Sequence, residues 1–203
     1  MTRIISGDFR GRRLAVPADT TRPTSDRVRE AVFSMLGSRF DVAGMRVLDL
    51  YAGTGALGLE AVSRGGASAV LVEADRRAAA VVRDNIAVCR ATARARVVQR
   101  SAEAFLAAPA GVFDLVFLDP PYEVPTGDVD GVLAALVGAV ADGGWVVLER
   151  GRRDGDVRWP EGFDEVVRKQ YGDSVVLVAT RVVRDDAVSG GSVAGDRPSE
   201  PIA

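Results

Sequence analysis

The chain has 203 residues, 47% of them hydrophobic and 27% charged, and a formal net charge of −2. This composition is typical of one globular domain, and no apolar run approaches the roughly 18 residues that cross a membrane. A single cysteine, Cys89, and the absence of histidine exclude an internal disulfide, the usual zinc sites and imidazole bases. Cys89 stands in a helical pattern and is expected in the core. No apolar signal segment is recognised at the start, so we expect a cytoplasmic protein.

The first segment is basic, because residues 1–29 contain seven arginines and three aspartates. The run RIISGDFRGRRLAV predicts two short strands joined by a turn between Gly7 and Gly11, which makes a β-hairpin that carries arginines. Phe9 is expected to pack within this hairpin. A basic arm of this kind indicates contact with a polyanion, with an ordinary solvated face as the alternative.

A helix is predicted next, in RPTSDRVREAVFSMLG. Thr24 or Ser25 is the expected cap, and Gly37 the expected end. The apolar positions fall on one helical face, so that Arg27 and Arg29 are expected to point away from the core, beside the hairpin.

From residue 46 onward, short apolar runs alternate with helical patterns. Strands are predicted at 46–51, 68–74, 95–99, 113–119, 144–150 and 174–183, and helices near 56–64, 75–91, 101–108 and 128–141. Near-continuous apolar strands separated by helices are typical of a parallel sheet covered on both faces. We therefore predict a doubly wound, Rossmann-like α/β fold with its ligand site at the carboxyl ends of the strands.

The predicted organisation has three parts. A basic hairpin and helix occupy 1–40, and the α/β domain occupies 41–184. The remainder, 185–203, is rich in Gly, Ser, Pro and Asp and is expected to be a disordered tail.

A glycine motif follows the first strand of the α/β domain. Gly53, Gly55 and Gly58 have the G-x-G-x-x-G spacing, and Glu73 ends the next strand. Such glycines allow a tight turn and the close approach of a nucleotide, and the acid binds ribose hydroxyls, so NAD fits the motif. Asp49, just upstream, opposes the phosphates of a dinucleotide and favours a cofactor with a cationic group, S-adenosylmethionine. Its alternative role is to cap the backbone amides of the turn.

The segment FDLVFLDPPY ends the fourth predicted strand of the domain with Asp119, two prolines and Tyr122. The prolines hold the loop open and remove two N–H donors, which leaves backbone carbonyls to accept hydrogen bonds. The exocyclic amino group of a base fits here, because the Asp119 carboxylate and the Pro120 carbonyl would accept its two protons. Tyr122 would stack on the ring. A rigid turn with a core tyrosine is the alternative.

Taken together, the segments RIISGDFRGRRL, RPTSDRVREAVFSML, LDLYAGTGALGLEAVSRG, VEAD and DPPY occur in an order and spacing that resemble the RsmD family of bacterial small-subunit rRNA methyltransferases. The resemblance runs from about Arg3 to Arg184, and RPTSDRVRE with the basic hairpin is its most specific part. It implies a class I S-adenosylmethionine-dependent methyltransferase that modifies N2 of guanine 966 in 16S rRNA. The implied substrate is the 30S subunit or an assembly intermediate, and the enzyme is expected to be a monomer.

The resemblance also implies residue roles. The cofactor residues are Asp49, Gly53 and Gly55 at the methionine end, Glu73 at the ribose, and Ser101 and Ala102 at the adenine, where the family usually has Asn or Asp in place of Ser101. The guanine residues are Asp119, Pro120 and Tyr122. The rRNA phosphate contacts are Arg10, Arg12, Arg13, Arg22, Arg27 and Arg29. No metal is implied.

Three other functions are compatible with the residues. An adenine-N6 methyltransferase uses the same proline turn, although so short a chain leaves no separate target-recognition region. A non-catalytic RNA-binding or assembly factor could retain an unused cofactor cleft. A nicotinamide oxidoreductase would share the glycine motif.

Overall fold

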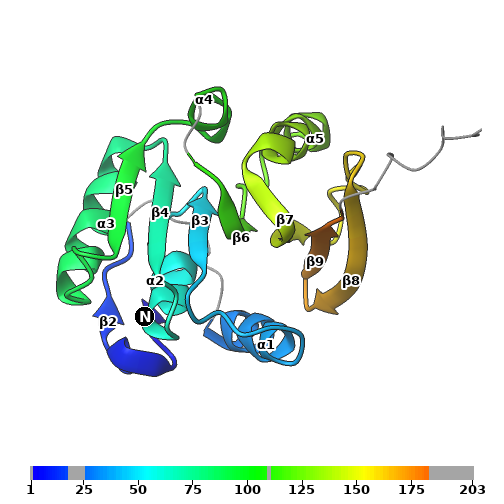
Figure 1. Cartoon of the computed structure of the whole chain (residues 1–203). Helices are drawn as coiled ribbons and strands as arrows, with labels where there is room; N and C mark the ends of the chain where they lie inside the picture. The colour runs from blue at the N-terminus through cyan, green and yellow to red at the C-terminus, as the bar shows by residue number, and fades with distance from the viewer. Residues whose placement is uncertain (1, 18–25, 109–110, 183–203) are drawn as a thin grey trace, which may run out of the picture.

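The structure, a computed structural model, describes residues 2–17, 26–108 and 111–182 (Figure 1). The tail expected at 185–203 lies outside these residues, as do Arg22 and the two candidate caps Thr24 and Ser25. Within the described ranges, no helix is long and apolar enough to cross a bilayer.

The described residues form a small hairpin and one seven-stranded sheet. The hairpin pairs β1 (Thr2–Arg3) with β2 (Arg13–Leu14) around the 3-10 turn η1 (Gly7–Phe9). The strands of the sheet are β3 (Arg46–Leu50), β4 (Ser68–Glu73), β5 (Ala95–Gln99), β6 (Phe113–Leu118), β7 (Val140–Gly151), β8 (Phe163–Tyr171) and β9 (Ser174–Arg181). The helices are α1 (Asp26–Gly37), α2 (Ala56–Ser63), α3 (Arg76–Val88), α4 (Ala102–Leu106) and α5 (Thr126–Ala135), with the 3-10 turn η2 (Leu136–Gly138) after α5.

The helices cover the sheet on both faces, as predicted (Figure 1). One apolar cluster joins the hairpin, α1, α2 and α3 to one face of the sheet, and the other joins α4 and α5 to the opposite face. Alternate residues of each buried strand supply the two clusters: Val47 belongs to the first and Leu48 to the second. Cys89 is buried in the first cluster, as expected.

The strand order is β5-β4-β3-β6-β7-β9-β8, and β3 to β7 run parallel. The predicted Rossmann-like arrangement is therefore confirmed for five strands. The order reverses between β4 and β6, on either side of β3, which is where ligands bind in folds of this kind. The last two strands of the sheet are joined by antiparallel pairing instead: β9 pairs with β7, and β8 pairs with β9.

Strand β8 was not predicted. Its sequence, FDEVVRKQY, is mostly exposed because it forms the edge of the sheet, so it lacks the apolar run of a central strand. The helix predicted at 128–141 also ends early, at Ala135, and β7 begins at Val140. An apolar run alone does not distinguish the end of a buried helix from the start of a buried strand.

The hairpin is bound to α2 through its backbone. Glu60, buried in α2, accepts hydrogen bonds from the N–H groups of Ile5 at 2.7 Å and Ser6 at 3.0 Å. The Ser63 hydroxyl accepts one from the N–H of Phe9 at 2.8 Å and donates one to the carbonyl of Ser6. Because buried polar groups need such partners, these bonds fix where the hairpin lies. Phe9 is buried, as expected.

Asn85 links the hairpin to the loop after β3. Its side-chain oxygen accepts from the N–H of Ala15 at 2.8 Å, and its amide nitrogen donates to the carbonyls of Ala15 at 3.0 Å and Thr54 at 2.9 Å. Asn85 is itself fully buried in α3. One side chain thus contacts both the end of the hairpin and the glycine loop.

Arg29 is wrongly predicted to face outward. It is 0% exposed, and its guanidinium donates to the carbonyl of Arg3, to Asp26 Oδ1 at 2.9 Å, and lies 3.8 Å from Glu60. Arg29 is predicted outside because a charged side chain usually faces solvent. In the structure, the buried Glu60 of α2 supplies a counter-charge inside the protein. Arg29 therefore connects α1 to the hairpin and α2, and it is not available to RNA. Arg27 is exposed, as predicted.

Candidate active site

The glycine loop connects β3 to α2. Gly53 and Gly55 have φ angles of +54° and +74°, in the left-handed region that favours glycine. A Cβ on Gly55 would lie 3.0 Å from the Leu71 side chain, and one on Gly58 would lie 3.0 Å from Leu71 and 3.1 Å from Asp49 Oδ2. A Cβ on Gly53 would meet nothing closer than 3.9 Å. Gly55 and Gly58 thus allow close packing beneath the loop, whereas the space over Gly53 is open.

Asp49 lies beneath this loop at the end of β3. It is 1% exposed, and its Oδ2 accepts the N–H of Gly58 at 2.9 Å, so it caps the turn. Burial raises the pKa of Asp49 to about 8, the hydrogen bond from Gly58 opposes this, and the carboxylates of Asp119 and Glu73 raise it further. These three acids end three neighbouring strands, β6, β3 and β4, and they lie close enough to act on one another.

Glu73 lies half-buried at the end of β4. One carboxylate oxygen accepts the N–H of Gly53 at 2.8 Å, and the other accepts the N–H of Asp75 at 2.9 Å. Each carboxylate oxygen has a second lone pair for a further donor. Glu73 therefore supports the glycine loop and retains acceptor capacity beside it.

Ser101 and Ala102 begin α4, after β5. The Ser101 hydroxyl accepts the N–H of Ala104 at 3.2 Å and caps this helix, and Ala102 is buried. Tyr51, whose φ is +60°, reaches α4 from the glycine loop and donates to Glu103 Oε1 at 3.3 Å. Burial and the nearby Glu103 raise the pKa of Tyr51, which keeps the phenol protonated. The sequence did not single out Tyr51, since no spacing rule marks it.

The proline loop follows β6 at the same edge of the sheet. Asp119 is half-buried, Pro120 is buried, and Tyr122 is 51% exposed. The loop is closed by a hydrogen bond of 3.0 Å from the N–H of Val124 to the carbonyl of Pro121. Tyr122 is therefore exposed, and the alternative of a rigid turn with a core tyrosine is wrong.

Arg150, at the end of β7, supports the proline loop from beneath. It is 4% exposed, its Nη2 donates to the carbonyl of Val124 at 3.2 Å, and its Nε lies 3.5 Å from Asp154. Its Nε and Nη1 have no hydrogen-bond partner among the described residues. A charged residue inside an apolar strand is the signal that could have identified it.

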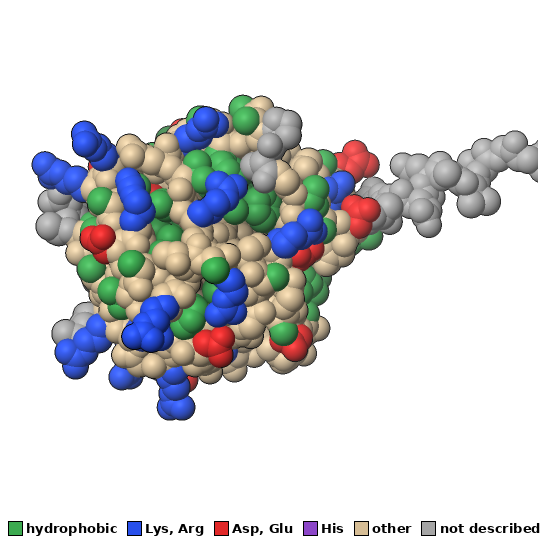
Figure 2. Space-filling view, turned by 60° about the vertical axis from the view of Figure 1, so that its left-hand side comes forward, with side chains coloured by type: hydrophobic (Ala, Val, Ile, Leu, Met, Phe, Trp, Pro, Cys, Tyr) green, Lys and Arg blue, Asp and Glu red, His purple; other side chains and the backbone are tan. Residues whose placement is uncertain are grey.

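The arginines of the basic arm differ in their surroundings. Arg10 and Arg13 are exposed, whereas Arg12 is half-buried, donates to the carbonyl of Val88 at 2.9 Å and stacks over the Phe9 ring. Figure 2 brings forward the side of the molecule that carries the hairpin and α3, and Lys and Arg side chains are spread across this face with few acids. The basic arm is thus part of a larger basic face.

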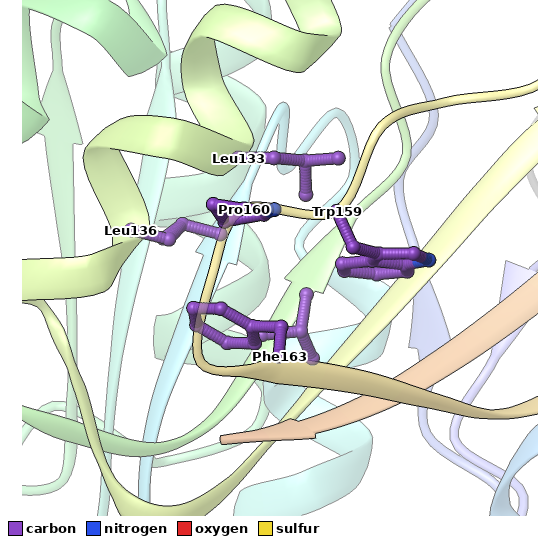
Figure 3. Close-up of a pocket in the computed structure, with 6 residues that line it drawn as sticks. Leu133, Leu136, Trp159, Pro160 and Phe163 are labelled. Carbon is purple, nitrogen blue, oxygen red and sulfur yellow. The ribbon is translucent and has the colours of Figure 1, made fainter. Parts of the chain in front are cut away.

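An apolar hollow lies away from the carboxyl ends of the parallel strands. It is found between α5 with η2 and the segment before β8 (Figure 3). It is lined by Leu133, Leu136, Val146, Trp159, Pro160 and Phe163. The only polar atom these side chains carry, the indole N–H of Trp159, donates to Glu165 at 2.8 Å. The hollow lacks polar groups to orient a ligand, so the candidate site is the one at the carboxyl ends of the parallel strands.

The parallel sheet with its glycine loop and the acid at the end of the second strand is a Rossmann-like fold, and a solved structure 36% identical to this chain shows it to be of the methyltransferase class. The family model described as "Conserved hypothetical protein 95" matches residues 2–180. The chain belongs to this family, the RsmD family that the motifs had indicated.

Individual relatives agree with this assignment. The chain is 41% identical over 148 residues to "Ribosomal RNA small subunit methyltransferase D" of Escherichia coli K12, covering 72% of this chain and 70% of the relative. It is 38% identical to "Putative rRNA methyltransferase YlbH" of Bacillus subtilis, covering 87% and 97%. The solved structure "Putative methyltransferase yhhF from Escherichia coli" superposes with a TM-score of 0.80 at 36% identity, covering 90% of this chain and 99% of that one.

Proposed function

We propose that the protein transfers a methyl group from S-adenosylmethionine to the N2 amino group of a guanine in 16S rRNA, at the position numbered 966. The observation that carries the proposal is the convergence of Asp49, Glu73 and Asp119 beside the open face of the glycine loop. The carboxylate of Glu73, and that of Asp49 once it is deprotonated, favour a cationic cofactor and disfavour the pyrophosphate of a dinucleotide. The names of the rRNA methyltransferase relatives support rRNA as the substrate.

The residues present fit this cofactor. S-adenosylmethionine supplies a methyl group activated by a sulfonium. Gly53 and Gly55 would line its methionine end, with the side chain of Asp49 beneath them, and the spare lone pairs of Glu73 would accept the ribose hydroxyls. At the adenine, the Ser101 hydroxyl is engaged as a cap, so the backbone at Ala102 is the better contact.

The proline loop would hold the guanine. The Asp119 carboxylate and the Pro120 carbonyl accept the two protons of the amino group, which draws the nitrogen lone pair out of conjugation with the ring. The methyl group would leave the sulfonium sulfur, which becomes a neutral thioether, as it bonds to the nitrogen; the nitrogen would then give up one of these protons to the Asp119 carboxylate. Tyr122, exposed at the end of the loop, stacks on a base that has left its helix.

The basic arm would bind the rRNA backbone. Arg10, Arg13 and Arg27 are exposed, and Arg12 presents a half-buried guanidinium. Phosphate contacts of this kind position RNA without reading its sequence, so the selection of one guanine rests on the shape of the substrate and on the pocket. We expect Arg22, next to this arm in sequence, to contribute as well.

The proposed setting is a cytoplasmic monomer that acts on the 30S subunit or on an assembly intermediate. In this proposal the arm (1–40) contributes docking and the methyltransferase domain (41–184) carries the chemistry.

The test is transfer of a labelled methyl group from S-adenosylmethionine to small subunits that lack the modification, followed by digestion to nucleosides. The expected product is N2-methylguanine, and mapping then gives its position. Label in another base would overturn the guanine-N2 assignment. Cofactor binding without any transfer would favour an assembly factor instead.

A further inference from the structure

The basic face continues beyond the hairpin. Residues 76–100, which form α3, the following turn and β5, contain seven arginines and a single acid, Asp84. β5 is one edge strand of the sheet and β8 is the other. Residues 151–182, which include β8, contain six basic and six acidic residues. The positive charge is therefore concentrated at one edge, on the side that Figure 2 brings forward.

The arginines at the two edges also differ in their partners. On β8, Arg168 is paired with Asp156 at 2.6 Å and with Glu165 at 2.8 Å, so its charge is used within the protein. Arg83 and Arg90 are exposed and make no ion pair with any residue of the described ranges. Their charge is directed to solvent, where a polyanion can reach it.

The hairpin and the end of α3 form one continuous surface. Arg12 of the hairpin and Arg94 of the turn before β5 lie over the same Phe9 ring, 5.2 and 5.3 Å from its centre. Arg94 also pairs with Asp8 at 3.3 Å, and Arg12 donates to the carbonyl of Val88. The contacts hold two positive charges near each other at the junction, which an anion would stabilise.

Arg90 has an unusual backbone conformation at the end of α3. Its φ is +53°, its N–H bonds to the carbonyl of Ala87, and the N–H of Ala91 bonds to the carbonyl of Ile86, both at 2.9 Å. This is the Schellman pattern at the end of α3, and the position of Arg90 in it is one that glycine normally occupies. An arginine there is strained, so this residue lowers folding stability relative to glycine.

We propose that the RNA-binding surface includes Arg83 and Arg90, and that this part binds the sugar-phosphate backbone of a base-paired RNA segment next to the target guanine. The proposal rests on the proposed function. Residues 76–94 contain no aromatic side chain on which unpaired bases could stack, whereas double-stranded RNA is recognised mainly through its phosphates and shape.

The test compares RNA affinity, its dependence on salt, and thermal stability in four variants, Arg90→Gly, Arg90→Lys, Arg83→Ala and Arg158→Ala. Arg90→Gly should raise the melting temperature by about 2–4 °C and weaken binding of protein-free 16S rRNA by about 3–10-fold at low salt. The slope of log affinity against log salt should fall in magnitude by about 0.7–0.9. Arg90→Lys, which keeps the charge, should retain most of the affinity without the gain in stability. Arg158→Ala removes one exposed charge near the opposite edge and should leave binding unchanged.

Each outcome bears on the proposal. If Arg90→Gly and Arg83→Ala bind rRNA as the wild type does, the surface is not a site. If oligouridine displaces rRNA as well as a duplex of about 20 base pairs does, the base-paired assignment is wrong. A loss of binding confined to whole small subunits would identify an acidic protein as the partner instead of RNA. Methyl transfer by the wild type is measured in parallel, because its absence would overturn the proposed function and not the binding surface.

Discussion

The glycine loop and the proline loop, which follow the neighbouring strands β3 and β6, are built in opposite ways. Gly53 of the glycine loop donates its N–H to the half-buried Glu73, and Gly58, in the first turn of α2, donates its N–H to the buried Asp49. No added Cβ fits at Gly58 without displacing a neighbour. The proline loop is closed by the hydrogen bond from Val124 to Pro121, and it leaves Tyr122 half exposed. A rigid loop suits a cofactor of constant shape, whereas an open loop suits a base that must enter from solvent.

The largest effect is expected at the proline loop. Asp119→Ala should lower the rate of methyl transfer by about 10²–10⁴-fold while the affinity for S-adenosylmethionine is retained, because the carboxylate acts on the base. Transfer kinetics and calorimetric titration of the cofactor measure the two quantities. Glu123→Ala, which removes a carboxylate four residues further along, is the matched control and should keep its activity. Loss of cofactor binding in Asp119→Ala would contradict the division between the loops.

A smaller effect is expected when the stacking ring is removed. Tyr122→Ala should reduce kcat/KM for the RNA substrate by about 5–150-fold, since stacking of a base on an aromatic ring contributes ~1–3 kcal/mol. Tyr122→Phe keeps the ring and should stay close to the wild type. Equal losses in both variants would assign the role to the hydroxyl group instead.

The glycine loop offers a matched pair of substitutions. Gly58→Ala should destabilise the fold by ~1–3 kcal/mol, because its methyl group would crowd Leu71 and Asp49. Gly53→Ala meets open space, so it should cost only ~1–2 kcal/mol of backbone strain but weaken cofactor binding. Chemical denaturation and cofactor titration separate these effects. Unchanged cofactor affinity in Gly53→Ala would place the cofactor elsewhere.

The most gradual effect concerns pH. The pKa of Asp49 is raised from 3.8 to about 8 by burial, so between these values the folded protein holds a proton that the unfolded chain has released. This contribution to stability is complete below pH 3.8 and declines as the pH rises towards 8, by at most ~1.4 kcal/mol per unit. The chain has no histidine to obscure the trend.

Asp49→Asn is the control for this effect, since the amide oxygen can still accept the N–H of Gly58. Its free energy of unfolding should depend less on pH between 5 and 8 than that of the wild type. Parallel curves for the two proteins would show that Asp49 does not titrate in this range.

Much of the architecture could be predicted because central strands such as β3 and β6 are continuous apolar runs, and because glycine spacing and the proline turn mark where two of them end. Strand β8 could not, since its residues pair through the backbone at an edge and carry no apolar pattern. The two open roles of Asp49 could not be separated either, because spacing does not say which backbone N–H a carboxylate reaches.

Buried charge was the other limit. Arg29 has the same sequence surroundings as the exposed Arg27, and only the three-dimensional approach of Glu60 explains why one is inside and the other outside. Asn85 is a similar case, since its contacts with Ala15 and Thr54 join residues 70 and 31 positions away. Signals of this kind arise from packing between distant segments, which local patterns do not contain.

The docking of the hairpin has a consequence for how the chain becomes functional during synthesis. Its hydrogen bonds to Glu60 and Asn85 span 54 to 70 residues, so the hairpin leaves the ribosome early but has nothing to dock on until α2 and α3 have been made. Gly7 packs so closely on the carbonyl of Ser63 that even a methyl group would not fit. The arm therefore takes its final shape only after α2 and α3 have been made, so under the proposed function a newly made chain cannot dock on RNA before the helices that adjoin its glycine loop are in place.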